Sequence, residues 1–439
     1  MLTMIELPEK YLEEMRELLK DDFDAYIKSF EQPHDTALRV NELKISVEEF
    51  LNIFPYHLEP IPWCHNGFYY NANDPITKHP YYYAGLYYIQ EASAMLPAES
   101  LPIEDGDRVL DICAAPGGKS TELGVKLNDT GVLISNDISY SRCQALLKNL
   151  EKFGIRNSYV CSETPEKLET YFPHYFNKIL IDAPCSGEGM FRKEHHLINS
   201  WIEHDSSYYV PIQKSIIKSC IDMLSEGGMI VYSTCTFSEK EDEEIIQYAL
   251  SLDSSLKVVP IQKCEGFSQN EYGTKLFPHR VKGEGHFISL LVKEGKKKEN
   301  KNKMHDYNIK QDIIHATFLD SQCIEINNRL YACRETGIDL NGLRIMRSGV
   351  LLGEKKKNRF EWDEILPMYL KEDEYSNVIY LSVDDPRVIK YLKGETIQIE
   401  DSSIKDGYAI ICVDKYPLGF VKVSKGSCKN KYSKSWIMK

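Results

Sequence analysis

Five short apolar runs separated by helical segments constrain the fold of this chain most strongly. They are RVLDIC (108–113), VLISND (132–137), SYVCSE (158–163), KILIDAP (178–184) and MIVYSTC (229–235). Continuous apolar runs that alternate with helices indicate a parallel sheet whose two faces are both buried. The expected fold is therefore a doubly wound α/β sheet. Further apolar runs at 256–261 and 285–293 are expected to close the sheet, the second as an antiparallel strand.

The 439 residues are enough for several domains. Before the sheet, helical spacing at 11–20, a strand at 37–44 and a serine-capped helix at 46–54 predict a small α+β domain. After the sheet, the lysine-rich run EGKKKENKNK predicts a linker. The expected division is an N-terminal α+β domain at 1–90, a sheet domain at 91–293, a linker at 294–303, an intermediate C-terminal domain at 304–372 and a strand-rich domain at 376–439.

The composition is that of an ordinary globular protein, with 42% hydrophobic and 27% charged residues. No apolar stretch approaches the ~18 residues of a membrane span, and the first residues lack the pattern of a signal peptide. We therefore expect a cytoplasmic protein without membrane contact. The twelve cysteines include no Cys-x-x-Cys pair, which predicts reduced thiols and no metal site.

The net charge of −13 argues by itself against a nucleic-acid partner. The C-terminal end is positively charged, because it contains no acidic residue after position 414. Seven lysines lie there, at positions 415, 422, 425, 429, 431, 434 and 439. This lysine cluster is either an RNA-binding face or a solvated tail, and charge alone does not decide between them.

The first predicted strand of the sheet runs into a glycine turn, DICAAPGGKST (111–121). A strand, a glycine turn and a helix N-terminus together form a small-ligand site. Asp137 ends the second strand, where an acid binds ribose hydroxyls or caps the next helix. Glu163 ends the third strand and is either an adenine contact or a surface carboxylate. The dinucleotide pattern G-x-G-x-x-G is absent.

Two cysteines and an aspartate lie at the ends of the fourth and fifth predicted strands. Asp182 and Cys185 belong to IDAPCSGEGMFRK, and Cys235 belongs to YSTCTFSEKEDEE. In a doubly wound sheet these strands are neighbours about 4.8 Å apart, so their carboxyl ends place all three side chains at one crevice. A buried cysteine is often only a small apolar residue, but Pro184-Cys185-Ser186-Gly187 lies where the chain leaves the sheet.

The segments DICAAPGGKS, DAPCSGEG and YSTCTFSEKEDE resemble the Nop/Sun family of RNA cytosine-5 methyltransferases. Further matches are LRVN (38–41), GLYYIQEASAM (85–95) and FPHRVKGEGHF (277–287), so the resemblance covers roughly 35–293. The C-terminal part, which ends in PLGFVKVSKGSCKNKYSKSW, resembles the PUA-like RNA-binding domain of the RsmF-like bacterial branch. That branch acts on small-subunit ribosomal RNA.

The resemblance implies a Rossmann-like methyltransferase sheet, S-adenosylmethionine as methyl donor and carbon 5 of a cytosine as acceptor. The implied partner is structured RNA, either 16S ribosomal RNA or the small ribosomal subunit, and residues 1–90 would bind RNA. The implied cofactor-binding residues are Cys113, Ala114, Ala115, Pro116, Gly117, Gly118, Lys119, Asp137, Glu163 and Asp182. Family members often carry Asp where this chain has Glu163-Thr164, so the adenine contact falls to one of these two residues.

The resemblance also assigns catalytic roles. Cys235 would attack carbon 6 of the cytosine, which makes carbon 5 nucleophilic by covalent catalysis. Cys185 would assist release of the product. Asp182 would hydrogen-bond the cytosine at N3 or at its amino group, and Lys119 would pair with Asp182 and set its charge. The target base must be unpaired or flipped.

Three other functions share part of this pattern. A nicotinamide-dependent dehydrogenase would leave the two cysteines unexplained, and a DNA cytosine methyltransferase resembles the chain less, because those enzymes use one cysteine after the fourth strand. A noncatalytic RNA-binding assembly factor would tolerate loss of either cysteine. We expect an RNA methyltransferase that does not act on DNA and works as a monomer; the modified cytosine cannot be predicted from the sequence.

Overall fold

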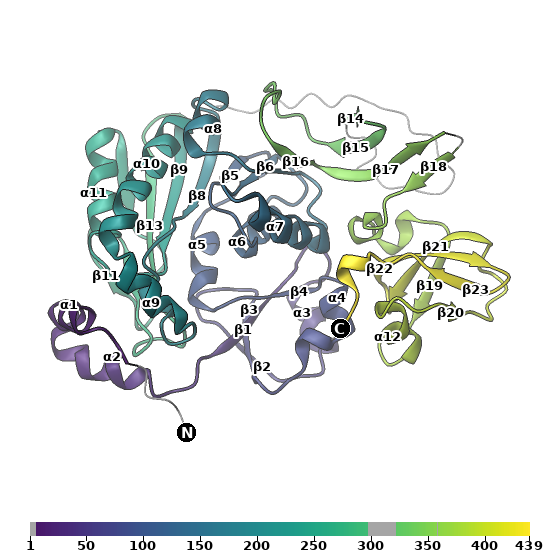
Figure 1. Cartoon of the computed structure of the whole chain (residues 1–439), viewed down its shortest axis with the longest axis horizontal. Coiled ribbons are helices and arrows are strands. Elements are labelled where there is room, and N and C mark those ends of the chain that lie inside the picture. The colour runs from purple at the N-terminus through teal and green to yellow at the C-terminus, as the bar shows by residue number, and fades with distance from the viewer. Residues whose placement is uncertain (1–5, 297–321, 358) are drawn as a thin grey trace.

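The computed structural model describes residues 6–296, 322–357 and 359–439. Residues 297–303 of the expected linker and residues 304–321 of the expected intermediate domain lie outside the described residues. Strands of the described chain form four sheets (Figure 1).

The N-terminal part is a four-stranded sheet in the order β2-β3-β1-β4, preceded by two helices. Its elements are α1 (Glu9–Leu19), α2 (Phe23–Ser29), β1 (Thr36–Val40), α3 (Val47–Ile53), β2 (Leu58–Pro60), β3 (Gly67–Tyr70), α4 (Pro80–Tyr83) and β4 (Tyr87–Ile89). The predicted serine cap of α3 is confirmed, because the Ser46 side chain accepts a hydrogen bond from the Glu49 amide.

The predicted doubly wound sheet is confirmed. Its strands lie in the order β11-β12-β13-β9-β8-β5-β6-β7-β16, and β10 pairs with β13. The helices are α5 (Leu96–Ser100), α6 (Gly118–Lys126), α7 (Tyr140–Phe153), α8 (Pro165–Tyr171), α9 (His196–Glu203), α10 (Ser206–Met223) and α11 (Glu243–Leu252). The strands from this segment are β5 (Arg108–Asp111), β6 (Val132–Asn136), β7 (Ser158–Cys161), β8 (Phe176–Asp182), β9 (Leu224–Thr234), β10 (Leu256–Val259), β11 (Ser268–Gln269), β12 (Thr274–Leu276) and β13 (His286–Lys293).

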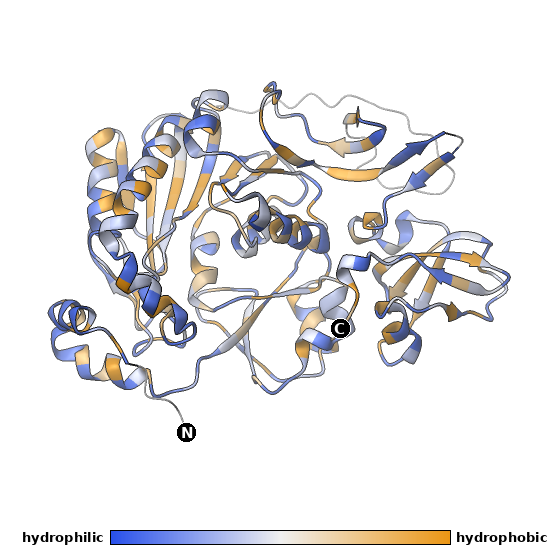
Figure 2. Cartoon of the chain, in the orientation of Figure 1, coloured by the Kyte–Doolittle hydropathy of each residue, from blue (hydrophilic) through white to orange (hydrophobic). Residues whose placement is uncertain are grey.

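Helices cover both faces of this sheet, as its apolar strands require. Side chains of α5, α6 and α7 pack on one face, and those of α8, α10 and α11 pack on the other. The central strands are correspondingly hydrophobic along their length (Figure 2). Strand β13 runs antiparallel to β9, as predicted. Strands β8 and β9 are parallel neighbours, which brings Asp182 opposite Ser233, two residues before Cys235.

The C-terminal part adds two further sheets, β14-β15-β17-β18 and β19-β21-β22-β23-β20. The elements are β14 (Gln322–Ile326), β15 (Arg329–Cys333), β16 (Ile345–Ser348), β17 (Val350–Lys356), β18 (Arg359–Trp362), β19 (Val378–Leu381), α12 (Pro386–Leu392), β20 (Ile397–Gln398), β21 (Gly407–Val413), β22 (Tyr416–Ser424) and β23 (Ser427–Asn430). Strand β16 leaves its own region and pairs antiparallel with β7, so it covers an edge of the central sheet. This addition was not anticipated.

The last sheet packs against the N-terminal part, and one apolar core runs through both. It joins Leu38 and Phe50 to Ile410 and Val421. Polar contacts cross the same boundary, including Tyr81 Oη to Asp414 at 2.7 Å. The two ends of the chain therefore stabilise each other, although more than 300 residues separate these contacts along the sequence.

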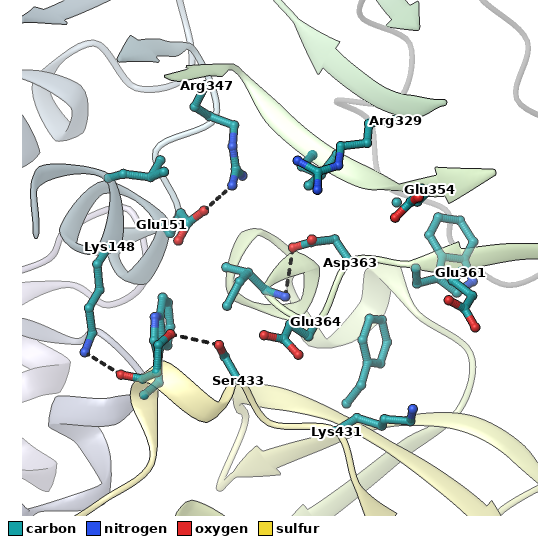
Figure 3. A pocket seen from close by; sticks show the side chains of 18 of the residues that line it. Lys148, Glu151, Arg329, Arg347, Glu354, Glu361, Asp363, Glu364, Lys431 and Ser433 are labelled. Atoms are coloured by element: carbon teal, nitrogen blue, oxygen red, sulfur yellow. Dashed lines mark hydrogen bonds and ion pairs between the residues drawn. The ribbon is translucent and has the colours of Figure 1, made fainter. Parts of the chain in front are cut away.

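A cavity of about 750 Å³ lies where α7, the β14–β18 region and the C-terminal segment meet (Figure 3). Glu151 of α7 pairs there with Arg347 of β16 at 2.7 Å. The Lys148 ammonium donates to the Ser435 carbonyl at 3.1 Å. These contacts tie three parts of the chain together. The cavity contains no cysteine and none of the predicted site residues.

Candidate active site

The turn after β5 has the geometry of a small-ligand site. Gly117 has a φ of +111°, a conformation that residues with a side chain avoid, and α6 begins at the next residue. Asp111 is buried beneath the turn and accepts a hydrogen bond from Ser120 Oγ at 2.6 Å. Burial raises the pKa of the Asp111 carboxyl to about 7. The backbone can therefore approach a bound molecule closely at this turn.

A cavity of about 270 Å³ opens beside the turn and brings most of the predicted residues together. The predicted residues in its lining are Cys113, Ala114, Ala115, Pro116, Gly118, Lys119 and Asp182. Its other wall was not predicted: Tyr88, Ile89 and Gln90 come from the N-terminal sheet. The segment GLYYIQEASAM drew attention only through the family resemblance, because a short strand without charged groups carries no signal for a ligand.

Asp137, Glu163 and Gly117 do not line this cavity. Asp137 is buried at the end of β6, pairs with Arg142 at 3.2 Å and accepts from the Ser139 amide. Ser139 caps the N-terminus of α7. The alternative in which Asp137 caps this helix is therefore wrong. Ile138 and Tyr140, which flank Ser139, are 66% and 53% exposed. They offer apolar surface next to a carboxylate, which the sequence reasoning missed.

Glu163 is engaged by the C-terminal part. Its Oε1 atom accepts from the Lys167 ammonium at 2.8 Å and from the Arg344 amide at 2.6 Å. Burial raises the pKa of its carboxyl, but hydrogen bonds from these two groups outweigh burial and leave the pKa below its usual value. This carboxylate therefore helps to hold the segment that leads into β16. An adenine contact by Glu163 stays a prediction.

The two predicted cysteines meet at the ends of β8 and β9. The sulfur atoms of Cys185 and Cys235 are 3.4 Å apart. The pKa of the Cys185 thiol lies well above its usual value, first because it shares a hydrogen bond with Cys235 and second because it is buried. Cys185 therefore holds its proton, which it can donate to the Cys235 sulfur.

Asp182 lies between the cysteines and the turn. Its Oδ2 pairs with Lys119 Nζ at 2.8 Å, and its Oδ1 accepts from Ser233 Oγ at 3.0 Å and lies 3.6 Å from His286 Nε2. Burial raises the pKa of Asp182, but the Lys119 charge and the nearby His286 ring outweigh it, so the pKa lies well below its usual range. The predicted Lys119–Asp182 pair is present, and the carboxylate is ionised at neutral pH.

Hydrogen bonds between the two cysteine loops fix the distance between the sulfurs. Ser186 Oγ and Thr236 Oγ1, each one residue after a cysteine, are 2.8 Å apart. The Gly189 amide donates to the Cys235 carbonyl at 2.8 Å. Glu241 accepts from the Ser186 amide at 3.1 Å. Sequence reasoning missed these partners, although Ser186, Thr236 and Glu241 belong to the segments that it quoted.

Among the described residues, no helix is both long and apolar enough to cross a membrane. The same residues contain no group of three or more side chains that could hold a metal ion.

Family models match four consecutive parts of the chain. Residues 7–92 match the N-terminal domain of 16S rRNA methyltransferase RsmF, and residues 98–292 match 16S rRNA methyltransferase RsmB/F. Residues 310–370 match the RsmF rRNA methyltransferase first C-terminal domain, and residues 379–438 match the methyltransferase RsmF PUA domain.

Solved structures share the fold of the larger part of the chain. A methyltransferase homolog protein from Pyrococcus horikoshii is 28% identical, covers 66% of this chain and 96% of its own, and has a TM-score of 0.57. The crystal structure of NSun6 from Pyrococcus horikoshii with SFG is 20% identical, covers 67% of this chain and 100% of its own, and has the same TM-score of 0.57. The latter likeness shows the fold.

Curated relatives match over almost the whole length. Ribosomal RNA small subunit methyltransferase F of Vibrio vulnificus strain YJ016 is 30% identical, with 92% of each chain covered. The protein of the same name from Erwinia tasmaniensis is 30% identical, with 98% of this chain and 96% of that protein covered. With this coverage, and with four matching models in the same order, the chain belongs to the RsmF-like branch of the Nop/Sun RNA methyltransferase family.

Proposed function

We propose that this chain methylates carbon 5 of a cytosine in 16S ribosomal RNA through a covalent bond between Cys235 and the base. One observation carries the proposal: two cysteine sulfurs lie 3.4 Å apart at the strand ends where an ionised Asp182 faces the glycine turn. Family membership supplies the reaction class and S-adenosylmethionine as the methyl donor. The contacts around the two sulfurs support different roles for Cys235, Cys185 and Asp182 in the reaction.

The site fits S-adenosylmethionine. Gly118 lines the cavity without a side chain, and a Cβ there would lie 3.0 Å from Gln90 Nε2, so glycine keeps the cavity open at this point. Asp137 is a carboxylate at the end of the second strand, in the position that binds ribose hydroxyls in doubly wound sheets. When bound, the cofactor supplies an electrophilic methyl group. The residues expected to hold it are those of the turn, residues 113–119, together with Asp137 and a contact from Glu163 or Thr164.

The protein's own groups would then act on the base in turn. The Cys235 sulfur adds to carbon 6, and the electron pair moves to carbon 5, which takes the methyl group. The proton on carbon 5 must then leave, and the bond between carbon 6 and sulfur must break to restore the ring. Once Cys235 is bonded to carbon, the hydrogen bond that raises the pKa of Cys185 no longer exists. Cys185 can then release its own proton to solvent, and the resulting thiolate takes the proton from carbon 5 while Cys235 leaves as a thiolate.

The charge of Asp182 determines which atom of the base it contacts. An ionised carboxylate accepts hydrogen bonds and cannot donate one. Asp182 would therefore accept from the exocyclic amino group of cytosine rather than donate to N3. The Lys119 ammonium, 2.8 Å from Asp182, keeps the carboxylate ionised and supplies the positive charge near the electron-rich ring.

The strand-rich C-terminal domain would bind RNA through part of its lysine cluster. Lys422 and Lys429 are exposed and lie directly opposite each other on β22 and β23. Like charges in this position repel, and an RNA phosphate would relieve that repulsion. Lys415 instead pairs with Glu49 at 2.6 Å, so not every lysine of the cluster is available. We also propose that the protein works as a monomer in the cytoplasm.

Methylation of defined substrates tests this function. The protein would be incubated with S-adenosylmethionine and 16S RNA, either naked or within the small subunit, and 5-methylcytosine would be mapped by bisulfite sequencing. The expected result is protection at one or a few cytosines, with none in a DNA copy of the same sequence. Absence of any protected cytosine in the RNA, or protection confined to the DNA copy, would contradict the proposal.

A further inference from the structure

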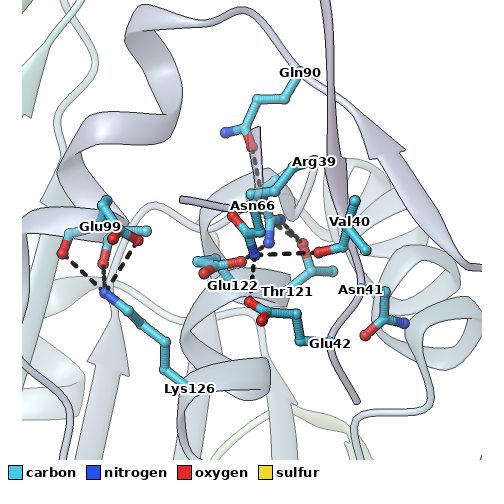
Figure 4. Close-up of polar contacts among 12 residues, drawn as sticks. Arg39, Val40, Asn41, Glu42, Asn66, Gln90, Glu99, Thr121, Glu122 and Lys126 are labelled. Carbon is cyan, nitrogen blue, oxygen red and sulfur yellow. Dashed lines mark hydrogen bonds and ion pairs between the residues drawn. The ribbon is translucent and has the colours of Figure 1, made fainter. Parts of the chain in front are cut away.

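Arg39 is a buried cation that lies away from the two cysteines. It belongs to β1 of the N-terminal sheet, and its side chain is 1% exposed. Burial lowers the pKa of its guanidinium to about 10, so it remains charged at neutral pH. The catalytic proposal gives it no role, although LRVN was one of the segments that marked the family resemblance. Figure 4 shows its surroundings.

The guanidinium of Arg39 contacts the first turn of α6. Its Nη2 atom donates to the Gly118 carbonyl at 2.8 Å and to Thr121 Oγ1 at 2.8 Å. It also forms an ion pair with Glu122, whose side chain is 2% exposed. These residues directly follow the glycine turn. One side chain from the N-terminal sheet thus holds the start of the helix that carries Lys119.

Arg39 also fixes Gln90, which lines the cavity beside the turn. Its Nε atom donates to Gln90 Oε1 at 3.3 Å, and Gln90 Nε2 donates to the Ala94 carbonyl at 3.1 Å. The two contacts set the orientation of the amide, with its nitrogen packed close to Gly118. Gln90 and Gly118 line the same cavity and lie next to each other. The guanidinium therefore sets the spacing between them.

A buried ion pair contributes little net stability, because removing both charges from water costs about as much as their attraction returns. A pair of apolar residues could hold the same two elements together. An arginine guanidinium, by contrast, fixes both the distance between the two elements and their relative orientation, since its donors have a rigid planar arrangement. The form of the contact favours positioning over simple stabilisation.

We infer that Arg39 is a positioning residue that locks the N-terminal sheet onto the start of helix α6 and thereby sets the shape of the S-adenosylmethionine pocket. The N-terminal sheet is then a component of the cofactor site, whatever its contribution to RNA binding. The inference rests on the proposed function only in taking S-adenosylmethionine as the ligand.

The same helix offers a matched control at its other end. Lys126 Nζ donates to the carbonyls of Ala98 and Glu99, each at 2.9 Å, and it does not line the cavity (Figure 4). It is also a largely buried cation that ties α6 to a neighbouring segment. Loss of Lys126 should cost stability without changing the pocket.

The experiment compares the full-length parent with Arg39→Met/Glu122→Gln and Lys126→Met. The double variant removes both charges, so that no buried carboxylate is left without its partner. Thermal unfolding would confirm that each variant is folded, and calorimetry without RNA would give the Kd for S-adenosylmethionine. We expect the Kd to rise at least about tenfold in the double variant and to change less than about twofold in Lys126→Met.

Kinetics separate positioning from a general loss of stability. In the double variant, the KM for S-adenosylmethionine should rise and kcat should fall, because Lys119 shifts with the helix, whereas the KM for RNA should stay unchanged. A folded double variant that binds S-adenosylmethionine like the parent would overturn the role of Arg39. A parent that does not bind S-adenosylmethionine would refute the proposed function instead, so the two failures are distinguishable.

Discussion

At the scale of single residues, the site depends on one partly buried carboxylate that is kept ionised. Asp182 has its pKa lowered well below the usual range against the effect of burial, chiefly by Lys119. In the proposed reaction, this charge accepts a hydrogen bond from the base. Without Lys119, burial would raise the pKa of Asp182 further, because the largest effect that lowers it would be lost.

Replacing Lys119 by methionine should therefore change the pH dependence of the reaction. The pKa of Asp182 should rise, so that the carboxyl of the variant gains a proton at a higher pH than in the parent, and the kcat of the variant relative to the parent should fall as the pH is lowered across the neutral to acidic range. Single-turnover rates across this range would measure the effect. Lys119→Arg keeps the charge and should follow the parent. A constant ratio between Lys119→Met and the parent at every pH would contradict this account.

The residues that meet here could be predicted to different degrees. Asp182, Cys185 and Cys235 were predicted to lie together because parallel neighbouring strands place their carboxyl ends at one edge. His286 and Gln90 were not, because they reach the site from an antiparallel strand and from the N-terminal sheet, and nothing in their local pattern specifies that approach. Arg39 was missed for the same reason, since a charged residue inside a short strand gives no sign of its distant partner.

At the scale of elements, β16 is the least expected feature. It joins β7 from the C-terminal part and is held to the central domain by the ion pair between Arg347 and Glu151, both of which line the cavity in Figure 3. The sheet itself could be predicted from its apolar runs. The addition of β16 to the edge of the sheet could not be predicted, because a four-residue strand that contains a charged residue carries no periodic signal.

The Glu151–Arg347 contact makes a prediction about stability. Burial raises the pKa of Glu151 to about 7 from its usual 4.5, and Arg347 reduces this rise only in part. The folded state thus holds a proton that the unfolded state releases, and the free energy of unfolding should fall as the pH rises from about 4.5 to about 7, then level off. Glu151→Gln lacks this effect, so its stability relative to the parent should rise over the same range, on the order of 2 kcal/mol.

Urea unfolding of the parent and of Glu151→Gln at several pH values would measure the difference. The exposed Glu203→Gln on α9 is the control and should give no such trend. A difference between parent and Glu151→Gln that is the same at every pH would show that the Glu151 carboxyl is ionised in the folded state throughout.

At the scale of the whole molecule, the two ends of the chain share one apolar core. Deleting the last domain would expose that core, so loss of RNA binding after a deletion would not identify an RNA-binding face. Substitution of exposed lysines is the sharper approach. The division into domains stays a prediction. The packing of the last domain on the first could not be predicted, because it depends on contacts between residues far apart in sequence.

The variant Lys422→Gln/Lys429→Gln should bind RNA more weakly and with a flatter salt dependence, its logarithmic slope reduced by about 2 if each lysine contacts one phosphate. Affinity for S-adenosylmethionine should not change. Lys390→Gln/Lys393→Gln removes the same charge from exposed positions in and beside α12 and serves as the control. Equal slopes for the two double variants would show that Lys422 and Lys429 form only a solvated surface.

Capture of the protein–RNA adduct tests the central claim most directly, because the proposed reaction uses Cys235 and Cys185 at different stages. Each cysteine would be replaced by alanine, singly and together, and incubated with S-adenosylmethionine and the RNA substrate before denaturing gel electrophoresis. Cys185→Ala should accumulate an adduct that survives denaturation, because attack and methyl transfer proceed but release is impaired. Cys235→Ala and the double variant should form no adduct, and neither should methylate RNA. An adduct that appears only in Cys235→Ala would reverse the two roles, and full activity of Cys235→Ala would show that the reaction does not proceed through this sulfur.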